Sequence, residues 1–196
     1  MSEWKTVSLR QELIKEIEEA IKTGRYRSIS EFVSEAIRLR LEDLMRTGGI
    51  TPEKRKELLA SPELLLYTPK HTWAQVTPEG NIRVGLSDYA QRHLKGIAHI
   101  MTDAVGKEVN KMEPFGVAET WMFMFDLYAP VSGKIVKVND ALKNEPNLIN
   151  EDPYGGGWIA EIKPKNSLVL EEELKSLLSS REYNKWVEKL EGRLRE

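Results

Sequence analysis

Side chains that could carry acid–base, metal or nucleophilic chemistry are few in this sequence. The chain has no cysteine, which excludes disulfides, thiolate metal sites and cysteine nucleophiles. Its histidines, His71, His93 and His99, follow no metal-binding spacing. The glycine run at 155–157 follows a proline and a tyrosine, and lacks the lysine and strand–helix setting of a phosphate-binding loop. We therefore predict no metal site, no catalytic residues and no enzyme activity.

An uninterrupted apolar run is the other feature that could define a site. Its five residues are Trp121, Met122, Phe123, Met124 and Phe125. Strand alternation would place its three aromatic side chains on one side and its two methionines on the other. Burying each such side chain contributes about 1.5–3 kcal/mol, so we expect the run to be covered. A second subunit, an apolar ligand or the chain's own C-terminal helices could cover it.

Four segments, together with the C-terminal tail, resemble the H protein of the glycine cleavage system. They are YTPKHTW (67–73), VGLSDYAQ (84–91), EPFGVAETWMFMFDLYAPVSG (113–133) and NEDPYGGGW (150–158), and the tail is SSREYNKWVEKL. The resemblance implies a barrel-sandwich hybrid, a flattened β-structure followed by C-terminal helices, over residues 67–196.

The same resemblance identifies a position that normally carries a cofactor. In that family the hairpin between the positions of Glu119 and Asp126 carries a lysine, whose amine is acylated by lipoate. The ungapped motif places Met122 at the position of that lysine, and no lysine lies between Met112 and Lys134. Because a thioether cannot form an amide, we expect this chain to keep the fold and to carry no lipoate.

The N-terminal residues predict a separate small unit. Residues 4–10 alternate between apolar and polar side chains, which is typical of a short strand. From Gln11 the apolar residues follow a helical period up to Thr23-Gly24, and a capping signature at Ser28–Glu31 begins a second helix. One strand and two helices bury too little surface alone, so we expect two chains to pair their strands.

This order resembles the ribbon-helix-helix proteins of the CopG and ParD type. The resemblance implies a strand-swapped homodimer whose paired strands enter the major groove of DNA. The DNA-contacting residues that it implies are Trp4, Lys5, Thr6, Ser8, Arg10, Arg25, Arg27, Ser28 and Ser30. Residues 1–46 contain nine basic and nine acidic side chains, so a unit that only dimerises remains an open alternative.

Composition and the positions of turn-forming residues complete the expected organisation. We expect an α+β protein with a ribbon-helix-helix unit at 1–46, a linker with one short helix at 47–66, and the H protein-like domain at 67–196. The 29 basic and 31 acidic side chains nearly balance, so no overall charge attracts nucleic acid. No apolar leader or membrane-length segment is present, which predicts a cytoplasmic protein without a membrane partner.

These expectations combine into two candidate functions. The first is a homodimeric DNA-binding transcriptional regulator, with the H protein-like domain as sensor or oligomerisation unit and the apolar hairpin as a contact between dimers. The second is a docking or scaffold protein of glycine cleavage or lipoate metabolism, dimerised by its N-terminal unit.

Overall fold

The computed structural model describes residues 8–22, 26, 28–46, 64–94 and 96–193. Its helices are α1 (Gln11–Ile21), α2 (Ile29–Arg46), α4 (Asp88–Leu94), α5 (Leu148–Glu151), α6 (Ser167–Lys175) and α7 (Ser180–Arg193), with a 3-10 helix η1 (Asp140–Lys143). Its strands are β1 (Leu66–Tyr67), β2 (Thr72–Val76), β3 (Ile82–Leu86), β4 (Ile97–Thr102), β5 (Glu108–Val109), β6 (Pro114–Thr120), β7 (Met124–Tyr128), β8 (Gly133–Val138), β9 (Ala160–Pro164) and β10 (Leu178–Ser179).

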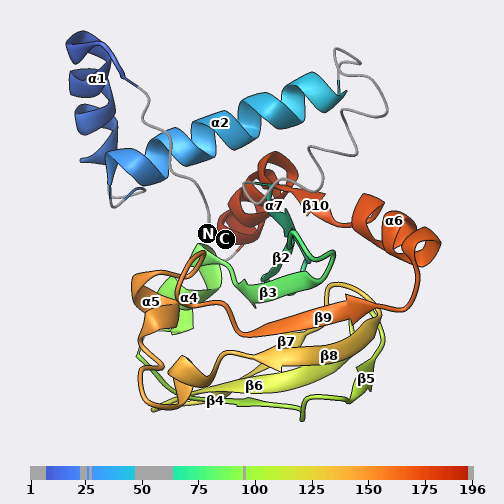
Figure 1. The fold of residues 1–196 in the computed structure, drawn as a ribbon. Helices are drawn as coiled ribbons and strands as arrows, with labels where there is room; N and C mark the ends of the chain where they lie inside the picture. Colours follow the sequence, from blue (N-terminus) through green and yellow to red (C-terminus); the bar gives the residue numbers. More distant parts are fainter. Residues whose placement is uncertain (1–7, 23–25, 27, 47–63, 95, 194–196) are drawn as a thin grey trace.

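Two antiparallel sheets form the body of the protein (Figure 1). The larger has the order β10-β1-β2-β3-β9-β8-β5, and the smaller has the order β4-β6-β7. Val84 and Ile162 of the larger sheet share one buried cluster with Phe115 and Leu127 of the smaller sheet. The core therefore lies between the sheets, which agrees with the barrel-sandwich β domain that the sequence predicts.

A second buried cluster attaches helix α7 to the larger sheet. It is built from Leu65, Tyr67, Trp73 and Tyr183. The Trp73 ring packs directly on Gly85 of the neighbouring strand, where an added Cβ would lie 2.5 Å from a ring carbon. Only a glycine at this position leaves room for the buried indole. Helix α7 coincides with the C-terminal segment for which the resemblance implied a helix.

Side-chain caps fix where the helices of the body begin. Ser87 Oγ accepts a hydrogen bond from Ala90 N at 3.2 Å at the start of α4. At α7, Ser179 N donates to Glu182 Oε2 at 2.9 Å and Glu182 N donates to Ser179 Oγ at 3.3 Å. This reciprocal pair is a capping box, which satisfies backbone donors that a helix leaves unpaired.

The N-terminal part contains the two helices that the sequence predicts. Ser28 Oγ accepts from Glu31 N at 3.2 Å, which gives the expected cap of α2. Ile17 of α1 is buried, and α1 contacts α2. The predicted strand is not confirmed, because residues 8–10 are not in a strand and residues 4–7 lie outside the described residues. The predicted linker helix also lies outside them.

No helix in the described ranges is long and apolar enough to cross a membrane.

Candidate functional site

The apolar run forms the tip of the hairpin that joins β6 to β7. Thr120 N donates to Phe123 O at 3.0 Å, which closes the turn around Trp121 and Met122. The Thr120 hydroxyl oxygen accepts from Met122 N at 3.3 Å and from Phe123 N at 3.1 Å. One buried threonine thus organises the whole turn.

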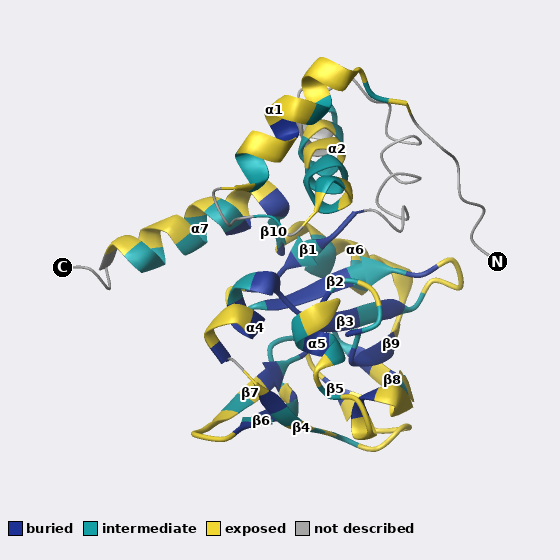
Figure 2. Cartoon of the chain, turned by 90° about the vertical axis from the view of Figure 1, so that its left-hand side faces the viewer, coloured by how far each residue is buried: buried dark blue, intermediate teal, exposed yellow. Residues whose placement is uncertain are grey.

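The tip is exposed to solvent. Trp121 and Met122 are 89% and 88% exposed, and Met124 is 62% exposed, so the loop between β6 and β7 is yellow in Figure 2. The expected alternation of the five side chains is wrong, because 121–123 form the turn and strand geometry resumes at Met124. Only Phe125 of the run packs against the core. The C-terminal helices, as far as they are described, do not cover the tip.

A groove of about 610 Å³ lies beside the hairpin. Its walls are Pro69, Lys70 and His71 before β2, Met124, Phe125, Asp126 and Tyr128 of β7, and Trp186 and Leu190 of α7. Lys70 Nζ lies 5.4 Å from the centre of the Tyr128 ring, and Asp126 is exposed. The groove is therefore lined largely by apolar side chains, and Lys70 and Asp126 contribute one charge of each sign. Such a groove suits a partner surface that is itself partly apolar.

His71 fixes one wall of this groove. Its Nδ1 lies 2.6 Å from the Tyr183 hydroxyl, which in turn lies 2.7 Å from Ser87 Oγ. Burial, with smaller contributions from His93 and Lys70, lowers the pKa of His71 from 6.5 to about 4. The ring is therefore neutral near pH 7. His71 joins the turn before β2 to α7, which is a structural task.

Attachment of lipoate requires a lysine amine, and the sequence has no lysine between Met112 and Lys134. The exposed side chains at the tip end in an indole, a thioether and a phenyl ring, none of which forms an amide. Asp152 has a structural role, because its Oδ1 accepts from Gly155 N at 3.1 Å. Among the described residues, no cluster of histidine and carboxylate side chains could hold a metal ion.

The residues expected to contact DNA are only partly described. Ser8, Arg10, Ser28 and Ser30 are exposed, and Arg10 O accepts the first helical hydrogen bond of α1 from Ile14 N at 3.1 Å. Trp4, Lys5, Thr6, Arg25 and Arg27 lie outside the described residues. No sequence pattern predicts the groove, because the motif that contains Lys70 and His71 indicates the fold alone.

Comparison with known proteins places the body in one family. The family model described as "Glycine cleavage H-protein" matches residues 65–190. The probable glycine cleavage system H protein of Pyrococcus abyssi is 47% identical over 128 residues, which cover 65% of this chain and 92% of that protein. The H protein of Carboxydothermus hydrogenoformans is 43% identical, and the match covers 65% and 94% of the two chains.

A solved structure agrees with these sequence matches. The crystal structure of a glycine cleavage system H protein from Mycobacterium marinum superimposes with a TM-score of 0.54 and 33% identity, covering 61% of this chain and 92% of that one.

The predicted DNA partner is wrong. The relatives are H proteins of the glycine cleavage system, so the partners that they indicate are the other enzymes of that system. The balanced charge of residues 1–46 supplies no surplus of phosphate-binding groups either. The regulator function has no support, and the comparisons favour the H protein-like alternative.

Members of the matched family are lipoyl-carrying carrier proteins rather than enzymes. The family model covers 126 of the 196 residues, from 65 to 190. Both sheets lie within that range, and so does helix α7 up to its last turn. This chain belongs to the glycine cleavage H-protein family.

Proposed function

We propose that this protein is a docking member of the H-protein family, which binds the other enzymes of the glycine cleavage system without carrying a lipoyl arm. One observation carries the proposal: the hairpin tip is fully presented, with Trp121 89% and Met122 88% exposed, yet it holds no amine. We assign Met122 to the position of the lipoyl-lysine. The chain can then occupy the surface that receives an H protein, but it cannot transfer a group.

The chemistry of the tip favours a protein partner. Exposed apolar patches of this kind mark interaction sites, and tryptophan is among the residues that contribute most at interfaces. Methionine is unbranched and polarizable, so it adapts to irregular pockets. The turn is held by the hydrogen bonds of Thr120, so the tip is ordered before binding and loses little conformational entropy on docking.

The domain organisation remains part of the proposal. We assign residues 1–46 to a ribbon-helix-helix unit that joins two chains, 47–66 to a linker and 67–196 to the docking body. The order and lengths of α1 and α2 support this assignment. Leu13 and Ile37 are 45% and 48% exposed, which offers apolar surface for a second copy. Sedimentation of the full chain as a monomer would contradict it.

The test is competition in a glycine cleavage assay that contains the enzymes of the system and a lipoylated H protein. Added protein should lower the rate, and further lipoylated H protein should restore it. Replacing both tip residues (Trp121→Ser with Met122→Ser) should raise the concentration needed for the same inhibition by about tenfold or more. The matched control is Leu168→Ser, because Leu168 is also exposed, at 77%, but lies on α6.

Absence of inhibition at large molar excess would overturn the proposal, and so would a tip variant as potent as the control. A separate measurement addresses the missing arm. Incubation with lipoate, ATP and a lipoate-attaching enzyme should leave the intact mass of the chain unchanged, whereas a lipoyl mass increase would show a working carrier.

A further inference from the structure

Helix α7 lies between two surfaces of the molecule and lines both of them. Asn184 and Val187 line a cavity of about 300 Å³ between α2, α4 and α7. Trp186 and Leu190 form one wall of the groove beside the hairpin. Residues two positions apart point to opposite sides of a helix, so these are two faces of α7. A movement of α7 therefore changes the cavity and the groove together.

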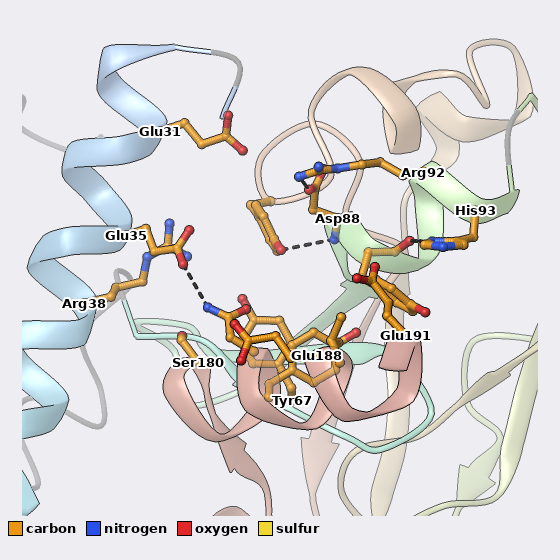
Figure 3. A pocket seen from close by; sticks show the side chains of 15 residues that line it. Glu31, Glu35, Arg38, Tyr67, Asp88, Arg92, His93, Ser180, Glu188 and Glu191 are labelled. Carbon is orange, nitrogen blue, oxygen red and sulfur yellow. Dashed lines mark hydrogen bonds and ion pairs between the residues drawn. The ribbon is translucent and has the colours of Figure 1, made fainter. Parts of the chain in front are cut away.

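Helix α2 contacts the side of α7 that faces the cavity. Figure 3 shows α2 on one side of the open space, α4 on the other and α7 below it. Asn184 Nδ2 donates a hydrogen bond to Glu35 Oε1 of α2 at 3.0 Å. The guanidinium carbon of Arg38 lies 5.6 Å from the centre of the Tyr154 ring, a distance at which the ring attracts a cation. These two contacts join the N-terminal helix pair to the body.

The contact between α2 and the body is weak. None of the described side chains of α2 is buried, and the cavity separates parts of the two surfaces. Side chains that border a cavity lack dispersion contacts on that side, and the hydrogen bond and the cation–ring contact are each modest. Helix α2 can therefore leave α7 without opening the core.

An aromatic stack also connects the cavity to the groove. The Tyr183 hydroxyl of α7 lies 2.6 Å from His71 Nδ1. The centre of the His71 ring lies 5.0 Å from that of Tyr89 and 5.1 Å from that of Trp186. Tyr89 lines the cavity, whereas His71 and Trp186 line the groove. Packed side chains of this kind form a continuous path between two surfaces.

We propose that the N-terminal unit controls docking at the groove. With α2 seated on α7, the helix is held against His71 and the groove wall is preformed. With α2 released, Trp186 and Leu190 lose this support, and a partner must order them at a cost in affinity. This control rests on the proposed docking function. Its two states are α2 seated and α2 released, and the seated state binds the partner more tightly.

The first test measures amide exchange on the full-length protein. Asn184→Asp with Arg38→Ala should release α2, because the new carboxylate faces Glu35 and the Tyr154 ring loses its cation. Exchange should become about threefold or more faster in α2 and in the segment of α7 that contains Trp186. Unchanged exchange in β3 and β9 verifies that the body stays folded.

The matched control is Asn144→Asp with Arg40→Ala. It makes the same change of charge at exposed positions outside the cavity, and it should leave exchange in α7 unchanged. Unchanged exchange in α2 of the release variant would overturn the assigned contact between α2 and α7. Faster exchange in α2 without a change around Trp186 would overturn the coupling.

The competition assay then measures docking. The release variant should require about fivefold or more protein than the control variant for half-inhibition. Equal potency of the two variants would overturn the control of docking by α2. Absence of inhibition by the wild type would instead contradict the proposed docking function, and the exchange measurement would still decide whether α2 supports α7.

Discussion

His71 adopts a left-handed backbone conformation, with φ of 66°, at the turn that leads into β2. Its ring lies between the rings of Tyr89 and Trp186, with centroid distances of 5.0 and 5.1 Å. A residue with a charge-bearing side chain is thus used for packing and for one hydrogen bond. The sequence predicted no catalytic or metal-binding role for this histidine. It could not predict the Tyr183 contact, because the two residues are 112 positions apart.

This environment predicts a pH-dependent stability. The unfolded chain binds a proton at His71 below about pH 6.5, whereas the folded chain does so only near pH 4. The unfolded state therefore holds more protons between these values, and the free energy of unfolding falls as the pH is lowered through them. The free energy of unfolding falls by at most about 3 kcal/mol over this range. The actual loss is smaller, because the ring is partly exposed and solvent screens its charge.

Urea unfolding at pH 7 and pH 4.5 tests the prediction. His71→Asn should flatten the difference between the two pH values, since asparagine tolerates a left-handed backbone and does not titrate. His99→Asn, at an exposed position of β4, should keep the wild-type difference. An unchanged difference in His71→Asn would assign the effect to other groups.

The β6–β7 hairpin shows what a pattern can and cannot predict for an element. The flanking strands and the apolar run were predictable, because their residue types are local and continuous. The alternation of side chains failed, since it assumed a strand through 121–123, where Thr120 forms a turn instead. The turn depends on a threonine hydroxyl that accepts two backbone hydrogen bonds. Such a turn has no hydrophobic periodicity by which it could be predicted from the sequence.

The turn should depend on that hydroxyl. Thr120→Val keeps the shape of the side chain and removes the acceptor for Met122 N and Phe123 N. Losing hydrogen bonds at a largely buried group should cost about 1–2 kcal/mol. Amide exchange at Met122 and Phe123 should become faster, while exchange in β8 and β9 keeps its rate.

Thr102→Val makes the same change at the end of β4, in the same sheet, and should leave the tip amides unaffected. If the tip amides exchanged at the same rate in the wild type and in Thr120→Val, the turn would be set by the course of the flanking strands and not by the hydroxyl.

At the scale of the whole molecule, two units lie against each other through polar contacts. The sequence predicted α1 and α2 from their periodicity and the body from its motifs. It gave no signal that α2 would lie on α7, since Glu35 and Asn184 are 149 positions apart and neither belongs to an apolar stripe. Only the folded body brings Tyr154, Asn184 and the α2 side chains together.

Because this contact is small and polar, α2 should open from the body without unfolding it. Arg38→Ala removes the cation from the Tyr154 ring, a contact worth about 0.5–1 kcal/mol at a partly exposed site. Amide exchange in α2 should accordingly become about two- to fivefold faster, measured by mass spectrometry on the full chain. Exchange in β3 and β9 should not change.

Arg40→Ala, at an exposed position of the same helix, controls for the loss of an arginine from α2. If Arg38→Ala accelerated exchange in α2 and in the sheets to the same extent, the helix and the body would form one cooperative unit.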